Sequence, residues 1–498
     1  MIRIFKKYWN EKPLTLIVFI AIFVRMFSVI FSKGFGMHDD HFLVVEIAKA
    51  WADGVDSNNW LPGTIENTGP SGHSFFYTGL HYILFCILKF IGITDPQNLM
   101  FFVRLIHAIF SLIVVICGYK IAERIHNINS AKTVGILLAT LWFMPFLSVR
   151  TLVEVACIPF LMISTWMIIK DDKNKWYYLI AGISAGLAMS IRYQSFLFVF
   201  GIFLAIFINK RWIESIIFGL FVVISFSLTQ IIVDMKLWGY PFAEFLTYVQ
   251  YNIDNAYNYL TNSWYSYILL ILGIIIPPIG FFIFFGFFRM WRKHLILFLP
   301  AFIFLAFHSY FPNKQERFIL PIIPFVITLG IVGWNQFKDK SNFWMKRKKL
   351  LKGFWIFFWA LNIILLPIIS TMYSKKARVE SMIYLSKYKN IKLILTEDSN
   401  SENFLMPPLF YLNQWLSTTA LTKANYSEKA KYSIDSKDNC PRFVLFFDEK
   451  NLTKRVDSLR FCFPQITYET TIHPSFVDEI LFKLNHRNTN QTIIIYKI

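Results

Sequence analysis

The chain has 498 residues, of which 55% are hydrophobic, 18% aromatic and only 16% charged, and its mean hydropathy is +0.47. This composition excludes an ordinary soluble globule and indicates a protein that crosses a membrane several times. The formal charge of +19 does not indicate a nucleic-acid binder, because Lys and Arg lie mostly in short clusters between apolar runs, where they set membrane orientation.

A membrane-length apolar run follows the basic N-terminus. It extends from Pro13 to Phe31, and since no small-residue cleavage site follows, we expect a retained signal-anchor helix at 13–32. Ten further runs of about 17 to 25 residues are expected to span. They lie at 100–121, 133–149, 152–169, 176–191, 194–208, 213–233, 264–288, 294–311, 319–336 and 353–373. The expected fold is an all-α polytopic membrane protein with about 11 transmembrane helices.

The apolar segment from Phe75 to Ile93 is interrupted by His81 and Lys89, so either a span or an interfacial helix fits it. Loop charge decides between them. If the segment does not cross, 22 Lys and Arg residues fall on the inner side and 9 on the outer side. If it crosses, every later loop changes side and the positive-inside bias is lost. We therefore expect an interfacial helix on the outer face.

With this topology, several polar segments emerge together on the outer side. They are His38–Glu46, Arg150 with Glu154, Arg192 with Tyr193, 234–262 and Asn313–Arg317. A transporter would instead place polar groups near the bilayer midplane, often on broken helices in repeated halves. No such repeat is present and the spans are nearly free of charge at their centres, so we expect a site on the outer face.

The sequence becomes more polar after the last expected span. Residues 374–498 are polar and long enough to form a small α/β domain on the outer side. Residues 1–373 are expected to form the transmembrane domain, in which 33–99 is the first outer loop. Expected strands are Ile391–Leu395, Phe443–Phe447 and Thr492–Tyr496, and expected helices are Ala377–Lys387, Leu405–Trp415 and Ser475–Leu484. Cys440 and Cys462 can form one disulfide if the domain lies outside.

The outer segments carry the groups that a sugar transfer from a lipid phosphate requires. Asp39 or Asp40 can accept a proton from the attacking hydroxyl. Arg150, Arg192, Lys314 and Arg317 can hold the leaving phosphate, although Arg150 and Arg192 also suit simple interfacial anchors. A phosphate is already a weakly basic leaving group, so one base suffices, and attack from the opposite face inverts the sugar carbon.

Histidines complete the set of polar groups on the outer side. His38, His41 and His308 have no HExxH-type spacing, so hydrogen-bonded or solvated imidazoles are expected rather than metal ligands. No cofactor is expected, and a requirement for a divalent metal stays open.

Five segments resemble a known family. Met37-His-Asp-Asp-His-Phe-Leu-Val-Val-Glu46 resembles the H-P-D-E-x-F-x-x-x-E motif of glycosyltransferase family 22, the membrane mannosyltransferases of GPI-anchor and N-glycan assembly within the GT-C superfamily. Ser309–Pro321 resembles its S-x-x-P-H-K-E-x-R-F loop. Three shorter segments resemble its remaining motifs in the same order: Val149–Glu154, Gly182–Arg192 and Asp234–Gly239. The resemblance covers about residues 20 to 335.

On this resemblance, Asp39 falls on the catalytic Asp of the family and Asp40 on the neighbouring Glu. A register shifted by one residue would make Asp40 the base; we prefer Asp39 because it also brings Phe42 and Glu46 into register. Lys314, Arg317 and Phe318 fall on matching positions. The chain departs from the family motifs at Met37, Asn313 and Gln315, which bears on the sugar and the acceptor more than on the reaction class.

The resemblance implies an inverting glycosyltransferase that moves a hexose, with mannose as the expected sugar, from a polyprenyl-phosphate donor to a lipid-linked or surface glycan. Asp39 would be the base, Asp40 and Glu46 would position it or the acceptor, and Arg192, Lys314 and Arg317 would hold the donor phosphate. Arg150 and His308 are further expected binding residues. Two alternatives stay open: a related enzyme that places a modified sugar on lipid A, protein or a polymer, and a lipid-linked glycan flippase.

The location of the protein is expected from its composition. Compact inner loops and a tail rich in Lys and Asn favour a bacterial inner membrane, with the site and the C-terminal domain on the periplasmic side.

Overall fold

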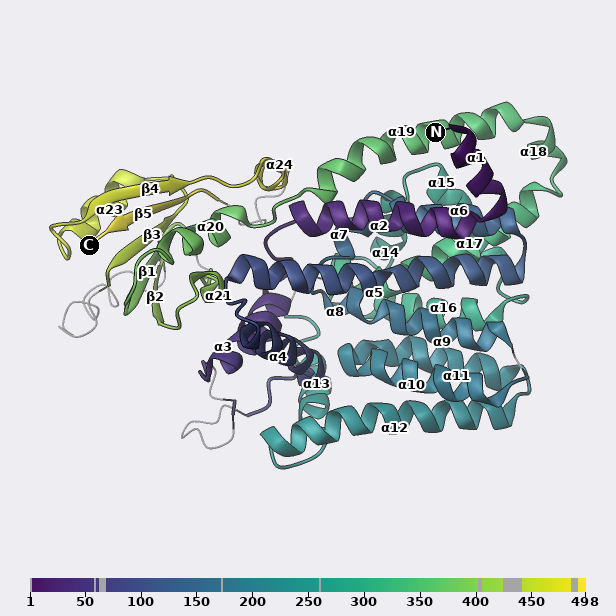
Figure 1. Ribbon diagram of the computed structural model, residues 1–498, viewed down its shortest axis with the longest axis horizontal. Coiled ribbons are helices and arrows are strands. Elements are labelled where there is room, and N and C mark those ends of the chain that lie inside the picture. Colours follow the sequence, from purple (N-terminus) through teal and green to yellow (C-terminus); the bar gives the residue numbers. More distant parts are fainter. Residues whose placement is uncertain are drawn as a thin grey trace. The chain divides into compact units, whose positions relative to one another are not determined.

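A computed structural model describes residues 2–57, 60–61, 69–171, 173–258, 261–401, 405–423, 441–484 and 491–498 (Figure 1). The chain forms two compact units. Unit 1 comprises Met1–Ile30, Asn58–Leu80 and Val103–Thr371, and unit 2 comprises Phe31–Ser57, His81–Phe102 and Met372–Ile498. The segments 31–57 and 81–102, expected to belong to the transmembrane domain, therefore pack with the C-terminal residues.

Apolar helices dominate unit 1, and the expected helical membrane fold is confirmed. Within the described residues, six helical stretches are long and apolar enough to cross a membrane: α2 (Pro13–Phe31), α5 (Pro96–Ile125), Val153–Lys170, α12 (Trp212–Leu237), Glu316–Lys338 and α19 (Lys348–Ser370). Shorter apolar helices are α4 (Phe75–Phe90), Tyr193–Ile208, α15 (Ile279–Arg289) and α16 (Leu295–Tyr310). The expected total of about 11 spans stays a prediction.

The remaining helical elements include short segments that break the expected spans. They are α1 (Ile2–Glu11), α3 (Ile47–Asp53), α6 (Ile128–Thr140), α7 (Met144–Leu147), α8 (Val153–Ala156), α9 (Ile158–Lys170), α10 (Lys175–Ile191), α11 (Phe196–Ile208), α13 (Ala243–Asp254), α14 (Ser266–Ile274), α17 (Ile323–Lys338), α18 (Asn342–Lys346), α20 (Lys376–Leu385), α21 (Leu409–Leu412), α23 (Leu452–Arg460) and α24 (Phe476–Leu484). Three further turns are a π-helix at Asp40–Glu46 and 3₁₀ segments at Tyr193–Ser195 and Glu316–Ile322.

The span expected at 133–149 is broken between α6 and α7, and buried polar side chains satisfy the freed backbone groups. The guanidinium of Arg25, in α2, donates to the carbonyls of Leu138 (3.3 Å) and Ala139 (3.2 Å) and to Ser111 Oγ (2.7 Å). Asn362 bridges the same break, because its Oδ1 accepts from the Trp142 amide at 2.8 Å. Carbonyls inside hydrocarbon require such partners. The expectation that span centres are nearly free of charge is therefore wrong at Arg25.

The span expected at 264–288 is also broken. α14 ends at Ile274 and α15 begins at Ile279, and Pro277 and Pro278 lie between them. Proline supplies no backbone donor and cannot continue a helix from the preceding turn. Helix α4 forms where the interfacial helix is expected, and its 16 residues are fewer than the roughly 20 that a span needs. Its interfacial placement stays a prediction.

Unit 2 contains a five-stranded sheet with the order β2-β1-β3-β5-β4. The strands are β1 (Leu393–Asp398), β2 (Ser417–Thr422), β3 (Phe443–Phe447), β4 (Thr467–Ile472) and β5 (Ile493–Lys497). β1 is parallel to β2 and β3, whereas β5 is antiparallel to β3 and β4. The expected small C-terminal α/β fold is confirmed, and the polar edge strands β2 and β4 were not expected.

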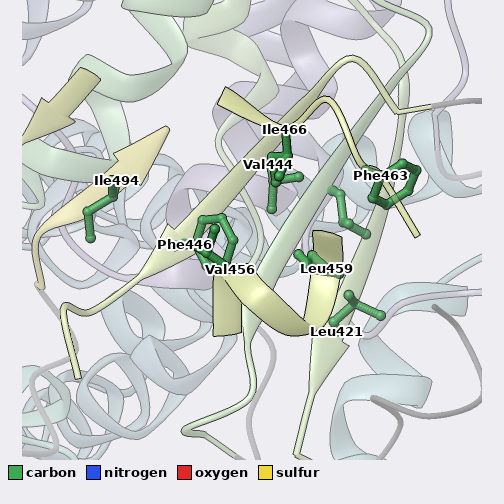
Figure 2. Packing of buried hydrophobic residues seen from close by; sticks show 9 residues of the cluster. Leu421, Val444, Phe446, Val456, Leu459, Phe463, Ile466 and Ile494 are labelled. Atoms are coloured by element: carbon green, nitrogen blue, oxygen red, sulfur yellow. The ribbon is translucent and has the colours of Figure 1, made fainter. Parts of the chain in front are cut away.

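The core of this sheet is apolar. Val444 and Phe446 of β3 pack with Ile494 of β5 and with Val456 and Leu459 of α23 (Figure 2). Burial of this face orders the C-terminal segment around the sheet. Cys462 has a free thiol, and Cys440 lies outside the described residues.

Candidate functional site

The structure gathers polar groups in two places, one in each unit. In unit 2, the segment after α2 turns at Gly34, whose φ of +76° is left-handed. Only glycine fits there, because a Cβ would lie 1.9 Å from the carbonyl oxygen of Ser374. The amide of Ser374 in turn donates to Lys33 O at 3.1 Å. This contact ties the segment before Asp39 to the residues that follow the last helix of unit 1.

The acidic cluster, defined as His38, Asp39, Asp40, His41 and Glu46, follows this turn. It lies at the start of and along the seven-residue π-helix Asp40–Glu46, an unusual element found most often at functional sites. Asp40 is 4% exposed and His41 1%, whereas Asp39 is partly exposed. The cluster therefore presents Asp39, of its two aspartates, more openly to a substrate.

Two cations from the C-terminal segment, the partly buried Lys375 and the buried Arg378, lie close to the acidic cluster. Lys375 lies 4.5 Å from the centre of the Phe35 ring, and the Arg378 guanidinium lies 5.4 Å from the same ring. Burial, and then the neighbouring Arg378, lower the pKa of Lys375 to about 7, against the opposing effect of Asp39 and Asp40. Burial likewise lowers the pKa of Arg378 to about 10. Sequence reasoning missed both residues, because Ser374-Lys-Lys-Ala-Arg378 has the pattern of a solvated loop after a span.

Glu46 is held by the backbone of α21. Its Oε2 accepts from the amide of Phe410 at 3.1 Å, and His41 Nε2 lies 3.6 Å from the same oxygen. Burial raises the pKa of Glu46 to about 8, so the carboxyl is largely protonated at neutral pH. Burial also holds the pKa of His41 well below its usual value, so its imidazole is neutral. Glu46 therefore suits a positioning role and not that of a base.

In unit 1, the arginine cluster consists of Glu154, Arg192, Gln194 and Arg317. Glu154 is 2% exposed, and its Oε1 is ion-paired with Arg192 Nη1 and lies 3.6 Å from Arg317 Nε. Arg192 also donates to Gln194 Oε1, and both guanidinium groups lie over the Phe318 ring, at 5.3 and 5.6 Å. Two cations, Arg192 and Arg317, thus lie at one buried carboxylate.

The remaining expected residues lie around this cluster or apart from it. His308 Nε2 lies 3.4 Å from Gln194 Oε1, and its Nδ1 lies 2.8 Å from the Phe304 carbonyl oxygen. Lys314 donates to the carbonyl of Phe311 at 2.5 Å, and burial lowers its pKa. Arg150 is 3% exposed and its guanidinium lies 4.4 Å from the Phe146 ring centre. The structure therefore brings Arg192, Arg317 and His308 together in unit 1.

Close helix packing sets the position of Arg192, which caps the C-terminus of α10. Helix α10 lies beside α12 (Figure 1), and the two backbones approach at Gly182 and Gly186. A Cβ at Gly182 would lie 2.5 Å from the Phe218 carbonyl oxygen, and one at Gly186 would lie 2.7 Å from that of Val222. Small residues allow such approaches between membrane helices.

A carboxylate that the sequence analysis did not single out holds the loop before α4. Glu244, fully buried at the start of α13, accepts hydrogen bonds from the amides of Ser71 (3.2 Å) and His73 (2.9 Å) and from Ser71 Oγ. Its own amide donates to Asp234 Oδ2 at 3.3 Å, which explains the aspartate of the Asp234–Gly239 motif. This pair secures the loop against α12 and α13.

Unit 1 also contains an apolar groove. It has a volume of about 470 Å³ and is walled by residues of α10, α11, α12 and α13, including Phe196, Phe200, Phe226 and Phe245. Tyr193, the residue after Arg192, stacks edge-on against Phe226 (6.1 Å) and Phe245 (5.3 Å). Tyr193, which follows Arg192 in the sequence, thus packs against the wall of the groove.

A family model and a known relative both indicate the same family of mannosyltransferases. The pattern of the Alg9-like mannosyltransferase family matches residues 15–406. Alpha-1,2-mannosyltransferase ALG9 of Mus musculus is 21% identical over 159 residues, which are 28% of this chain and 26% of that relative. The match thus spans about a quarter of the relative's length.

Two solved structures share the fold. ArnT from Cupriavidus metallidurans, solved bound to undecaprenyl phosphate, has a TM-score of 0.65 at 11% identity, over 97% of this chain and 98% of that one. The archaeal oligosaccharyltransferase AglB from Archaeoglobus fulgidus, solved with an inhibitory peptide and a dolichol-phosphate, has a TM-score of 0.54 at 12% identity, over 89% and 70%. At these identities the likeness shows a common GT-C fold alone.

Proposed function

Because the chain belongs to the Alg9-like mannosyltransferase family and is a membrane glycosyltransferase, we propose that it transfers mannose from a polyprenyl-phosphate donor to a lipid-linked or surface glycan. The observation that carries the proposal is that unit 1 holds both the arginine cluster and an apolar groove, and that Tyr193, next to Arg192 in the sequence, packs against the groove wall. A polyprenyl-phosphate sugar has the matching parts, namely a long apolar chain and a phosphate. The transfer inverts the sugar carbon.

The arginine cluster would bind the donor phosphate. Arg192 and Arg317 both lie at Glu154, and their guanidinium groups would attract the anionic phosphate. Arg192 Nε is buried and has no hydrogen-bond partner in the described part of the chain, which leaves a donor for a phosphate oxygen. As the bond between the sugar carbon and the phosphate oxygen breaks, negative charge grows on the phosphate, and fixed guanidinium donors stabilise it. The prenyl chain would lie along Phe200, Phe226 and Phe245 in the groove.

The acidic cluster would supply the base. Asp39 would take the proton of the acceptor hydroxyl while the hydroxyl oxygen attacks the sugar carbon opposite the phosphate. Lys375, which lies close enough to Asp39 and Asp40 to interact with them electrostatically, would help to bind a polar acceptor there. Asp40 and the protonated Glu46 would position the base or the acceptor. The role of base is assigned from the carboxylates of the acidic cluster alone, and the role of phosphate binding from the guanidinium groups of the arginine cluster alone.

The test is sugar transfer in proteoliposomes that contain polyprenyl-phosphate-mannose and a crude lipid-glycan acceptor. We expect Asp39→Asn to lower the turnover about 100-fold or more, the contribution typical of a general base, with little change in donor KM. Asp457→Asn, in an exposed carboxylate of the same unit, is the matched control. Full activity of Asp39→Asn, with loss in Asp40→Asn, would move the base by one residue.

Two further experiments test which sugar the donor carries and whether the reaction needs a metal ion. Polyprenyl-phosphate donors that carry other hexoses test the sugar, and equal transfer from them would contradict mannose. We propose that the enzyme needs no cofactor, and addition of a chelator is therefore expected to leave the rate unchanged. We place the reaction on the periplasmic side of a bacterial inner membrane, in keeping with the excess of Lys and Arg in the loops assigned to the inner side.

A further inference from the structure

Unit 2 contains a cavity that the proposed transfer reaction does not use. It has a volume of about 350 Å³ and is lined by Lys49 and Asp53 of α3, by Lys89 near the end of α4, and by Asn413. A second cavity of about 360 Å³ shares Asn413 and adds Lys389. We call the first the lysine cavity. Its polar lining distinguishes it from the apolar groove of unit 1.

The charges of the lysine cavity are unbalanced. Asp53 is ion-paired with Lys49, and its other oxygen lies 3.5 Å from Lys89 Nζ. Trp415 Nε1 also donates to Asp53 Oδ2 at 2.9 Å, so this carboxylate is fully engaged. The Lys49 side chain is only 7% exposed. Lys89, which is half-exposed, also donates to the Ala52 carbonyl at 2.8 Å. Among the lining residues, two ammonium groups therefore share one carboxylate, and the second ammonium favours the binding of an anion.

The position of Lys89 identifies the kind of anion. Its side chain is half-exposed, and its neighbours Ile87, Phe90 and Ile91 are 55%, 92% and 59% exposed. Exposed apolar residues next to a lysine on an amphipathic helix are typical of the level where lipid headgroups meet hydrocarbon. An anion that reaches the lysine cavity past Lys89 would then carry an apolar chain beside Phe90 and Ile91.

We propose that the lysine cavity binds the phosphate of a membrane lipid. The phosphate lies between Lys49 and Lys89, in reach of the Asn413 amide, and the lipid chains extend over the exposed face of α4. The site is separate from the arginine cluster, so it does not depend on which sugar or acceptor the enzyme uses. Charge-assisted hydrogen bonds from both lysines give the site its preference for a phosphate.

The test is lipid binding to the purified full-length protein, followed by native mass spectrometry during titration with phosphatidylglycerol or phosphatidylcholine. We expect one molecule of the anionic lipid to be retained in preference to the zwitterionic one. Lys89→Gln removes the net charge of the cavity and leaves the Lys49–Asp53 pair intact. It should weaken this binding about tenfold, the loss of one charge-assisted hydrogen bond. Lys89→Arg should retain it.

Lys392→Gln, at an exposed lysine of the same unit that lines neither cavity, is the matched control and should bind as the wild type does. Equal retention of the two lipids, or an unchanged affinity in Lys89→Gln, would overturn the proposal. The remaining experiment measures the binding of inorganic pyrophosphate. If it binds as tightly as the lipid does, the apolar chain contributes nothing and the site is one for a soluble phosphate.

Discussion

Substitution of Glu154 is the most direct test of how the arginine cluster is held together. Glu154→Gln removes the carboxylate that is ion-paired with Arg192, whose side chain is 5% exposed, and that lies 3.6 Å from Arg317. Breaking a buried ion pair in this way costs about 3 to 5 kcal/mol. Arg317→Gln instead leaves the Arg192–Glu154 ion pair in place. It should cost only about 1 kcal/mol, the net value of one hydrogen bond.

The two variants should therefore separate stability from donor binding. Glu154→Gln should be strongly destabilised and regain stability when polyprenyl phosphate is added, because the anion replaces the lost carboxylate. Arg317→Gln should fold normally and bind polyprenyl phosphate about tenfold or more weakly. The double variant should be no less stable than Glu154→Gln, because the two substitutions act on one interaction.

The measurement is equilibrium unfolding of the purified protein in mixed micelles, with and without polyprenyl phosphate. Glu123→Gln, which removes an exposed carboxylate from α5, is the matched control. If Glu154→Gln unfolds within about 0.5 kcal/mol of the wild type, the change expected of an ordinary surface substitution, the carboxylate does not hold the two arginines and the charge argument fails.

Two further predictions concern stability. Arg25→Met removes two hydrogen bonds to carbonyls at the broken end of α6 and one to Ser111 Oγ, and it should lower the free energy of unfolding by about 2 to 5 kcal/mol. The exposed Arg124→Met should not, and equal stability of both would show that Arg25 does not stabilise the broken end of α6. Glu46 has a pKa of about 8 in the folded protein and 4.5 in the unfolded chain, so its contribution is complete below pH 4.5 and is lost as the pH rises to 8. The free energy of unfolding of Glu46→Gln should therefore fall less between pH 5 and pH 8 than that of the wild type, and parallel profiles would contradict a buried, protonated Glu46.

The fold class and the family were predictable because their signals are local. Apolar runs report helices directly, and the segments around Asp39 and Arg317 are continuous in sequence. The position of Arg192 was predictable for the same reason, since its motif includes Gly182 and Gly186, which bring α10 onto α12.

Residues that act through distant contacts were not predictable. Lys375 and Arg378 follow the last membrane helix, more than 330 positions after Asp39, and nothing in their own segment indicates burial. Arg25 was missed for another reason. One arginine among 19 residues of high mean hydropathy hardly changes the average, whereas its role depends on carbonyls of α6. A hydropathy average cannot show where another helix will end.

The arginine cluster and the lysine cavity use the same physical device, although they lie in different units and on unrelated elements. In each, two cations share one carboxylate: Glu154 between Arg192 and Arg317, and Asp53 between Lys49 and Lys89. A pair of buried cations alone would repel each other, and a pair matched by two carboxylates would have no charge left for a ligand. In each site, one shared carboxylate offsets the repulsion between the two cations, and both cations can still attract a phosphate. Glu154→Gln and Lys89→Gln therefore test one principle from opposite sides, since the first removes the shared carboxylate and the second removes one of the two cations.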